Sequence, residues 1–281
     1  MIKKIFNIVL IMFVLQGSFC LAAQTQKEAK SMSRTEICNE NLSKLFNGLT
    51  LSNKGNDPEM MAILQKYIFG EVFTVGELDI KTREMITVVS LTTQQTLPQL
   101  KAHINAALNV GVAPIELREA IYQCAPFIGF PKTLNALGVL NEVFAERKIN
   151  TPLAPKATVN ENDRYEKGLA IQAPLYGDEI KEQMKGLPDK MGEDVSRFLT
   201  EVCFGDFYTR DGLDVKTREL LVLSILVTTG DTDTLKRHIY GNIKAGNTEA
   251  QIAALIIQCM PYTGMPNALA ALRTLKDSMA K

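Results

Sequence analysis

Histidine is scarce in this chain, which has only two histidines, His103 and His238, among its 281 residues. An excess of charge of one sign is also missing, because 31 lysines and arginines stand against 31 aspartates and glutamates. Without a basic stripe, nucleic acid is not an expected partner. The sequence also lacks a glycine-rich phosphate loop, a Walker-type lysine and the nucleophile elbow of α/β-hydrolases.

An internal repeat relates the two histidines. Shifting the sequence by 135 residues places Phe69–Leu140 on Phe204–Leu275 without a gap, and 26 of these 72 positions are identical. The longest identical run is Lys-Thr-Arg-Glu, and a histidine follows its glutamate by 19 residues in both copies. The two resulting pairs are Glu84 with His103 and Glu219 with His238. One histidine and one carboxylate in each copy fall short of a three-ligand set, so we expect no metal site.

Residues 1–23 have the order of charge, apolar core and small residues that is typical of a secretory signal peptide. Two lysines precede the apolar run Ile5–Leu15, which is too short for a comfortable membrane span, and Ala22-Ala23 follow it. A retained membrane anchor and a lipid-attached Cys20 are the alternatives. No later stretch is apolar enough to cross a bilayer. The sequence therefore predicts a secreted, periplasmic protein without stable membrane insertion.

Two domains are predicted after the signal peptide, at residues 24–148 and 163–281, because this length suits two domains of about 110–130 residues. The segment between them, residues 149–162, contains two prolines and few apolar side chains and is predicted to be a linker. Residues 24–40 are polar, and we expect them to be loosely ordered.

Both domains are predicted to be helical, and the expected fold class is all-α. Asp79 and Asp214 are typical N-caps of the helix that carries the glutamate, since an aspartate accepts hydrogen bonds from the first turn. Gly111 and Gly246 end the histidine helix, as C-terminal glycines commonly do. Apolar residues recur at helical spacing, and no segment shows the strict alternation of a half-buried strand.

Helical spacing places each glutamate and each histidine on an apolar face of its helix. A carboxylate on such a face needs a hydrogen-bonding partner. We therefore predict that Glu84 with His103, and Glu219 with His238, form catalytic acid–base pairs on neighbouring helices. The alternative is that each pair is a satisfied core hydrogen bond that only fixes how the helices pack.

Four cations near these pairs are weaker candidates for substrate binding. Arg83 and Arg218 come four residues after the predicted N-cap aspartates, so an ion pair on the helix surface is their first interpretation. Lys101 and Lys236 suit solvated positions, although either one could face an anionic substrate at the mouth of a pocket.

The number and positions of the cysteines do not show whether their thiols are free or oxidised. Four cysteines follow the predicted signal peptide: Cys38, Cys124, Cys203 and Cys259. Cys124 and Cys259 occupy equivalent positions of the repeat, which would suit a redox pair or two small buried residues. The absence of a Cys-x-x-Cys arrangement favours burial. The sequence gives no disulfide pairing.

Together these motifs resemble the carboxymuconolactone decarboxylase family. The first copy carries Leu-Asp-Xaa-Lys-Thr-Arg-Glu, a Leu-Lys-Xaa-His-Ile helix, and Gly-Phe-Pro-Xaa-Xaa-Leu-Asn-Ala-Leu at residues 129–137. The second copy adds Arg-Tyr-Glu-Lys-Gly-Leu at 164–169 and Tyr-Gly-Asp at 176–178. The resemblance covers nearly the whole chain after the signal peptide, and it implies two tandem alkylhydroperoxidase-D-like domains. Such domains usually form trimers or hexamers with sites in clefts, so a tandem chain is expected to be a homo-oligomer, a trimer that imitates a hexamer.

The resemblance implies one of two activities. Its peroxidase-like branch carries Cys-x-x-Cys between the glutamate and the histidine, where this chain has Thr96 and Gln99 in one copy and Asp231 and Thr234 in the other. The thiols that reduce a peroxide are therefore absent. The other branch decarboxylates a lactone acid without a cofactor and uses histidine and glutamate for proton transfer. We expect a carboxy-lyase-like enzyme that acts on a small carboxylated or lactone organic acid.

Three alternatives stay open at this stage. The first is peroxidase or antioxidant activity of the same fold, and the second is a non-catalytic periplasmic binding or assembly module. The third is a thiol peroxidase that uses Cys124 and Cys259. The predicted export is unusual for an enzyme of aromatic degradation, so the sequence does not name the substrate.

Overall fold

The computed structural model describes residues 32–52 and 54–280, and these residues form helices and loops without a β-strand. This confirms the predicted all-α class. The described residues from Arg34 onward form one compact unit. No helix within the described ranges has the length and hydropathy needed to span a membrane. The predicted signal peptide lies outside the described residues.

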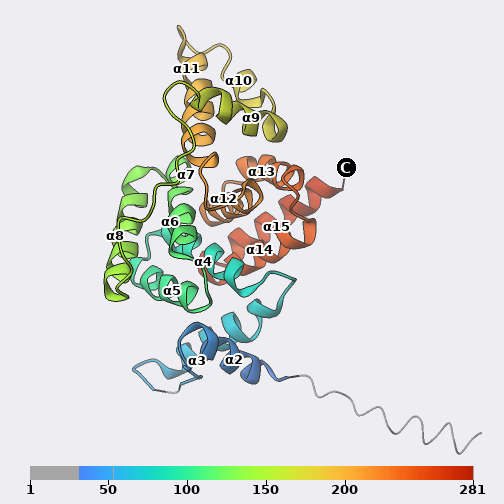
Figure 1. Ribbon diagram of the computed structural model, residues 1–281. Helices are drawn as coiled ribbons and strands as arrows, with labels where there is room; N and C mark the ends of the chain where they lie inside the picture. Colours follow the sequence, from blue (N-terminus) through green and yellow to red (C-terminus); the bar gives the residue numbers. More distant parts are fainter. Residues whose placement is uncertain (1–31, 53, 281) are drawn as a thin grey trace, which may run out of the picture. The chain divides into compact units, whose positions relative to one another are not determined.

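Each copy of the repeat contributes one set of helices (Figure 1). The first half contains α2 (Arg34–Leu45), α3 (Pro58–Gly70), the 3₁₀ turn η1 (Val72–Thr74), α4 (Ile80–Gln94), α5 (Leu97–Asn109), α6 (Pro114–Tyr122), α7 (Ala125–Ile128) and α8 (Phe130–Glu146). The second half contains α9 (Arg164–Tyr176), α10 (Glu179–Gln183), α11 (Met191–Phe198), the π-helix η2 (Leu199–Tyr208), α12 (Val215–Thr229), α13 (Thr232–Lys244), α14 (Glu249–Thr263) and α15 (Met265–Met279).

The predicted helix ends are confirmed. The Asp79 carboxylate accepts a hydrogen bond from the Thr82 amide at 2.8 Å, and Asp214 does the same for Thr217 at 2.7 Å. Gly111 and Gly246, which follow the histidine helices, have φ angles of 87° and 92°. Glycine adopts this left-handed conformation without strain, which explains why both helices end there.

The prediction that residues 24–40 are loosely ordered is wrong from Arg34 onward. Cys38, Leu42 and Leu45 recur at helical spacing among polar residues, and α2 buries all three in a small core with α3 and α5. The two halves also differ after the histidine helix, because the first half has two separate helices there, α6 and α7. Their counterpart α14 is continuous through Pro261.

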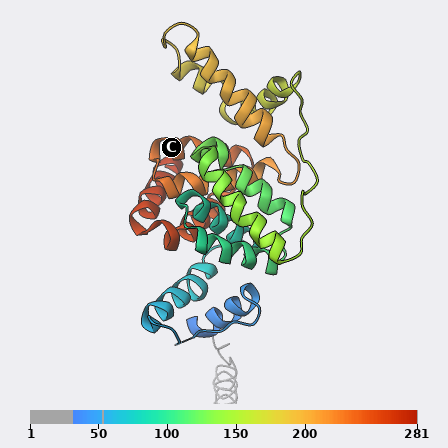
Figure 2. The same cartoon turned by 90° about the vertical axis from the view of Figure 1, so that its left-hand side faces the viewer.

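The glutamate helices α4 and α12 form the centre of the compact unit. Every residue from Arg83 to Thr93 and from Arg218 to Thr228 is buried, so each helix is covered on all sides. α4 packs against both α12 and α14, which joins the two halves in one core (Figure 2). Glu84 and Glu219 therefore lie on helices whose central residues are all buried.

Close helix contacts position the N-terminal helices of each half. A Cβ atom on Gly168 would lie 2.3 Å from the Thr200 carbonyl oxygen, and one on Gly205 would lie 2.5 Å from that of Arg164. Only glycine permits this approach of α9 to η2. α2 and α3 meet in the same way at Gly70, where a Cβ would lie 2.3 Å from the Arg34 oxygen.

Candidate active site

The second half builds a network of four side chains around Glu219. The Tyr176 hydroxyl donates a hydrogen bond to Glu219 Oε2 at 2.5 Å and lies 2.7 Å from His238 Nδ1. The Tyr208 hydroxyl donates to Glu219 Oε1 at 2.7 Å. His238 Nδ1 itself is 3.4 Å from Glu219 Oε2, so Tyr176 bridges the predicted pair.

The hydrogen bonds of this network indicate which atoms donate and which accept. Burial, together with the charge of Glu219, raises the pKa of both Tyr176 and Tyr208, so both phenols stay protonated and act as donors. Since the Tyr176 proton is directed to Glu219, its oxygen is free to accept the hydrogen bond of His238 Nδ1–H. This arrangement leaves His238 Nε2 as the ring nitrogen available to a ligand.

A single glycine makes room for the bridging phenol. A Cβ atom on Gly241 would lie 2.3 Å from the Tyr176 hydroxyl oxygen. In the first half the repeat places Ala106 at this position, and the contacts of α2 with α3 make Phe46 the counterpart of Tyr176. The first half therefore has neither the phenol nor the space for its hydroxyl group.

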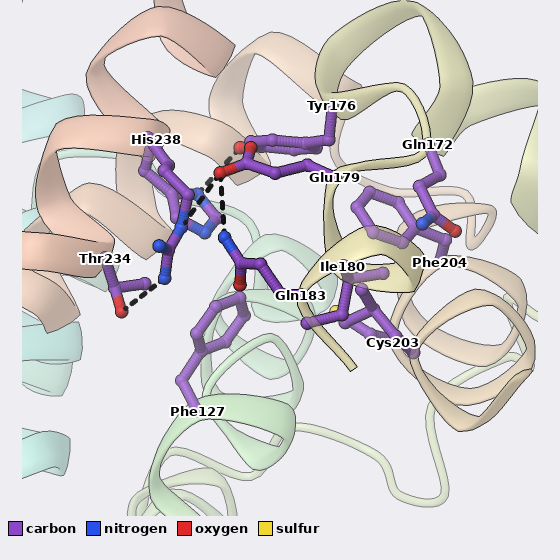
Figure 3. A pocket seen from close by; sticks show the side chains of 12 residues that line it. Phe127, Gln172, Tyr176, Glu179, Ile180, Gln183, Cys203, Phe204, Thr234 and His238 are labelled. Carbon is purple, nitrogen blue, oxygen red and sulfur yellow. Dashed lines mark hydrogen bonds and ion pairs between the residues drawn. The ribbon is translucent and has the colours of Figure 1, made fainter. Parts of the chain in front are cut away.

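A cavity of about 180 Å³ opens beside His238. Figure 3 shows Tyr176, Glu179 and His238 on one side of it and Gln172, Cys203 and Phe204 on another. Its remaining lining residues are Phe127, Ile180, Gln183, Leu199, Thr234 and Arg237. The π-helix η2 supplies Leu199, Cys203 and Phe204, as π-helical segments often do at functional sites. The walls are mostly apolar, with a few convergent polar groups, which is typical of small-molecule sites.

The first half pairs its two predicted residues directly. His103 Nδ1 lies 2.9 Å from Glu84 Oε2, and no described residue makes a hydrogen bond to Glu84 Oε1. The rings of Phe46 and Tyr262 stand edge-on to the His103 ring, with centroids 6.1 and 5.7 Å away. The sequence thus predicted both pairs, but only His238 lines the cavity described above.

Each site is completed by the opposite half. Phe127 of the first half lies edge-on to His238, with ring centroids 5.7 Å apart, and its repeat counterpart Tyr262 has the same separation from His103. The two halves are therefore not independent modules, because each histidine lies beside an aromatic ring from the other half.

The interpretation of Arg83 as a surface ion pair is wrong. Arg83 is 2% exposed, and its guanidinium donates to four backbone carbonyl groups and to Gln258 Oε1 at 3.1 Å. Burial lowers the pKa of Arg83, and Asp79 opposes this shift. All five guanidinium N–H groups are used, so Arg83 has no donor left for a substrate.

Arg218 is likewise buried, and its side chain contacts residues of the first half. It is 0% exposed, donates to Gln123 Oε1 at 3.0 Å and lies 3.4 Å from Glu119 Oε2. Glu119 also binds Arg210 at 2.7 Å and Arg118 at 3.0 Å. Burial alone would raise the pKa of Glu119, but its hydrogen bonds and charge interactions with the three arginines hold that pKa below the usual value. The arginines predicted to bind substrate instead join the two domains.

The two predicted lysines have different surroundings. Lys101 forms ion pairs with Glu146 at 2.6 Å and Glu142 at 3.5 Å on the surface. Lys236 lines a surface depression that shares Tyr176 with the cavity. Of the two, only Lys236 is near the His238 site.

Cys38, Cys124, Cys203 and Cys259 are all free and buried. Burial raises the pKa of Cys124 and Cys203, and it raises that of Cys259 to about 12. Such thiols are poor nucleophiles at neutral pH, which disfavours the thiol peroxidase alternative. Among the described residues, no group of three or more His, Cys, Asp or Glu side chains could hold a metal ion.

Sequence reasoning missed the partners of Glu219 and His238. These are Tyr176, Tyr208 and Phe127. Tyr176 belongs to the Tyr-Gly-Asp motif already noted, but nothing local shows that it reaches a histidine 62 residues later. A comparison of the two copies would have shown one signal, because Gly241 replaces Ala106.

Comparisons with known proteins agree with this architecture. The model of the carboxymuconolactone decarboxylase family matches twice, at residues 58–142 and 193–277, and these matches cover more than half of the chain. The chain belongs to this family. Its two family domains carry the alkylhydroperoxidase-D-like fold as tandem copies.

Three relatives are each similar to less than half of the chain. The 4-carboxymuconolactone decarboxylase of Acinetobacter baylyi is 27% identical over 120 residues, 42% of this chain and 89% of that protein. The nitrosuccinic acid decarboxylase of Metarhizium robertsii is 26% identical over 121 residues, 42% of this chain and 85% of its own. An uncharacterised 15.0 kDa protein of Paracoccus denitrificans is 35% identical over 91 residues, 32% of this chain and 68% of that protein. At the level of the family, a decarboxylase-like function is supported.

Proposed function

We propose that the second half holds the active site of a cofactor-independent decarboxylase that acts on a small carboxylated or lactone organic acid. The observation that carries this proposal is the position of His238, which borders a cavity while Tyr176 and Glu219 hold its Nδ1 side. Two relatives named as decarboxylases support the reaction class.

The proposed chemistry needs a proton donor and no bound electron carrier. The C–C bond to the substrate carboxylate breaks, CO₂ leaves, and the electron pair moves through a conjugated double bond into a carbonyl group. Protonated His238 then gives its Nε2 proton to the resulting carbon and is reprotonated from solvent. The substrate carboxylate thus takes up one proton overall and releases CO₂.

Glu219 and the two tyrosines act as positioning residues in this scheme. The fully buried carboxylate of Glu219 holds the Nδ1 side of His238 in place through the Tyr176 bridge. Tyr208 occupies the second carboxylate oxygen, so Glu219 cannot rotate away from His238 without losing a hydrogen bond. A fixed network of this kind lowers the reorganisation that proton transfer requires.

CO₂ release is the test of the proposed function. Purified protein is incubated with 4-carboxymuconolactone, with nitrosuccinate and with a panel of related unsaturated acids, and headspace CO₂ is measured from pH 5 to 9. We expect release that His238→Gln lowers about 100-fold or more while melting is unchanged. Equal CO₂ release by wild type and His238→Gln would contradict the proposal.

We also propose export and assembly as a trimer of tandem chains. Exposed apolar residues recur at equivalent positions of the two halves, Phe130 and Leu134 on α8 and Met265 and Leu269 on α15, which supports an interface between copies. Analytical ultracentrifugation of wild type and Leu134→Glu/Leu269→Glu checks the assembly. Intact-mass measurement of exported protein checks cleavage after Ala22 or Ala23.

A further inference from the structure

The proposed decarboxylation places negative charge on a carbonyl oxygen for which no hydrogen-bond donor has yet been named. When CO₂ leaves, the electron pair of the broken C–C bond moves into the carbonyl group, whose oxygen is an enolate oxygen until His238 protonates the carbon. A donor that is fixed in a site without bulk water stabilises such an oxygen most strongly. His238 lines one side of the cavity. The donor should therefore come from another part of the cavity wall.

Gln172 of α9 places a buried amide in that wall. The residue is 3% exposed, and Figure 3 shows its amide beside Phe204, away from His238. The Thr200 hydroxyl donates to Gln172 Oε1 at 2.6 Å, a shorter contact than the 3.1 Å to the Ser196 carbonyl oxygen. No described residue accepts a hydrogen bond from Gln172 Nε2. Because Thr200 holds the oxygen of the amide, the nitrogen is the atom that can donate to a ligand.

The other amide, hydroxyl and guanidinium donors of the lining are less suited to this task. Gln183 is exposed, and its Nε2 already donates to Glu179 at 3.1 Å. Thr234 and Arg237 are partly exposed, so that water competes for their hydrogen bonds. A buried donor is worth more to a developing charge, because the local dielectric constant is lower.

The first half has an apolar residue at the corresponding position. Gly70 and Gly205 lie against the carbonyl oxygens of Arg34 and Arg164, which aligns α2 with α9 and places Leu42 at the position of Gln172. Leu42 is 1% exposed and belongs to the small core of α2 and α3. A buried amide is less favourable than leucine unless its polar atoms find partners. The unused nitrogen of Gln172 therefore indicates a ligand and not a packing role.

We propose that Gln172 is a catalytic residue whose Nε2 donates a hydrogen bond to the substrate carbonyl oxygen, and that Thr200 is the positioning residue that orients its amide. The inference rests on the proposed function and specifies its substrate as a conjugated carbonyl compound, held with the carbonyl group at Gln172 and the carbon to be protonated at His238. Gln172 keeps its hydrogen throughout. When His238 protonates the carbon, the electron pair returns from the oxygen and the carbonyl group is restored.

Turnover is the first test. Gln172→Leu introduces the residue of the first half, and Gln172→Met keeps an unbranched side chain without a donor. Both should lower kcat for CO₂ release about 100-fold. KM should change little, because the hydrogen bond strengthens only as charge develops on the oxygen. Gln65→Leu, the same change at a buried glutamine of α3 that does not line the cavity, should leave kcat per folded molecule unchanged.

The second test needs no turnover. γ-Crotonolactone is an unsaturated lactone without a carboxylate, and an isotope label on its carbonyl carbon separates its C=O band from the protein bands in infrared difference spectra. A hydrogen bond weakens the C=O bond, so we expect the band of the bound lactone at lower wavenumber in wild type than in Gln172→Met. Thr200→Val, which keeps the amide but frees its orientation, should give an intermediate position, and Gln65→Leu should match wild type.

Three results would overturn the inference: no bound lactone in wild type, the same band position in wild type and Gln172→Met, or an unaltered kcat in both Gln172 variants. A band shift that depends on Gln172 in a protein that releases no CO₂ would refute the proposed function alone, since the donor to the carbonyl group would then be present without the reaction.

Discussion

The two glutamate–histidine pairs differ in whether a third side chain lies between the carboxylate and the imidazole ring. In the first half, Glu84 touches His103 directly at 2.9 Å. In the second half, the corresponding pair is 3.4 Å apart and the Tyr176 hydroxyl connects it. A repeat that keeps both residues has thus produced two environments, one flanked by the rings of Phe46 and Tyr262 and one that borders the cavity described above. Conserving the pair within the chain does not by itself conserve a site.

Removing each histidine is the strongest way to test this difference. His238→Gln should lower turnover about 100-fold or more, because it removes the proton donor at the cavity. His103→Gln should leave turnover per folded molecule nearly unchanged and lower the melting temperature, since it leaves buried Glu84 without its partner. CO₂ release and melting of both variants give the answer.

Equal losses of turnover in the two variants would mean that both sites are active and that the bridging tyrosine is not what distinguishes them. Two destabilised proteins with unaltered turnover would instead show that both pairs only hold helices together.

The two buried arginine contacts that join the halves differ as well. We expect a substitution of Glu119, which the Arg83 contact does not have, to give the larger change in the free energy of unfolding. The buried Glu119 carboxylate binds Arg118, Arg210 and Arg218, whereas Ala254 stands at its repeat position. Glu119→Ala leaves buried positive charge without a partner and should lower the free energy of unfolding by about 3–5 kcal/mol. Urea unfolding at pH 7 measures it, with the exposed Glu142→Ala as a control that should change little.

The effect of Glu119 should depend on pH. The arginines hold the pKa of Glu119 below its ordinary value, so its stabilising contribution is complete above the unfolded-state pKa of about 4.3. As the pH falls through the folded-state pKa, the carboxylate is protonated and the contribution is lost. The difference between wild type and Glu119→Ala should therefore shrink in acid. A constant difference from pH 7 to pH 3 would contradict the ion-pair explanation.

The sequence predicted what local spacing determines. The aspartate N-caps, the terminal glycines and the inward-facing pairs all follow from residues within one or two helical turns. It did not show that α2 is an ordered counterpart of α9, because the repeat offset changes from 135 to 130 residues before the gapless segment. That change also hid the correspondence between Phe46 and Tyr176.

Long-range partners explain the other errors. Arg83 follows Asp79 at the spacing of a surface ion pair, but its side-chain partner Gln258 is 175 residues away in the sequence. A helical period tells which face a residue occupies, and it does not tell which helix will cover that face. Both arginines were assigned to the surface for this reason.

The hydrogen-bond bridge made by Tyr176 can be disrupted by a substitution at a different residue, Gly241. Gly241→Ala introduces the residue that the first half has at this position, and its Cβ would collide with the Tyr176 hydroxyl at 2.3 Å. We expect turnover to fall about tenfold, as the loss of one hydrogen bond to a charged group would cause, and Tyr176→Phe to do the same. The double variant should be no slower than either single variant. Additive losses would show that Gly241 acts through something other than Tyr176.

The smallest effect should come from the buried amide that braces α12 against α13 in the second half only. Asn242 Nδ2 donates to the carbonyl oxygens of Glu219 at 3.0 Å and His238 at 2.8 Å, and Ala107 stands at its position in the first half. Because both carbonyl groups belong to helices that keep their own hydrogen bonds, Asn242→Ala should lower the free energy of unfolding by only about 1 kcal/mol. Turnover per folded molecule should hardly change, since Tyr176 and Tyr208 still hold Glu219 in place. Thermal unfolding and CO₂ release measured on the same sample separate the two effects. A loss of turnover as large as that of Tyr176→Phe would mean that the brace between the helices, and not the phenol, sets the second site apart from the first.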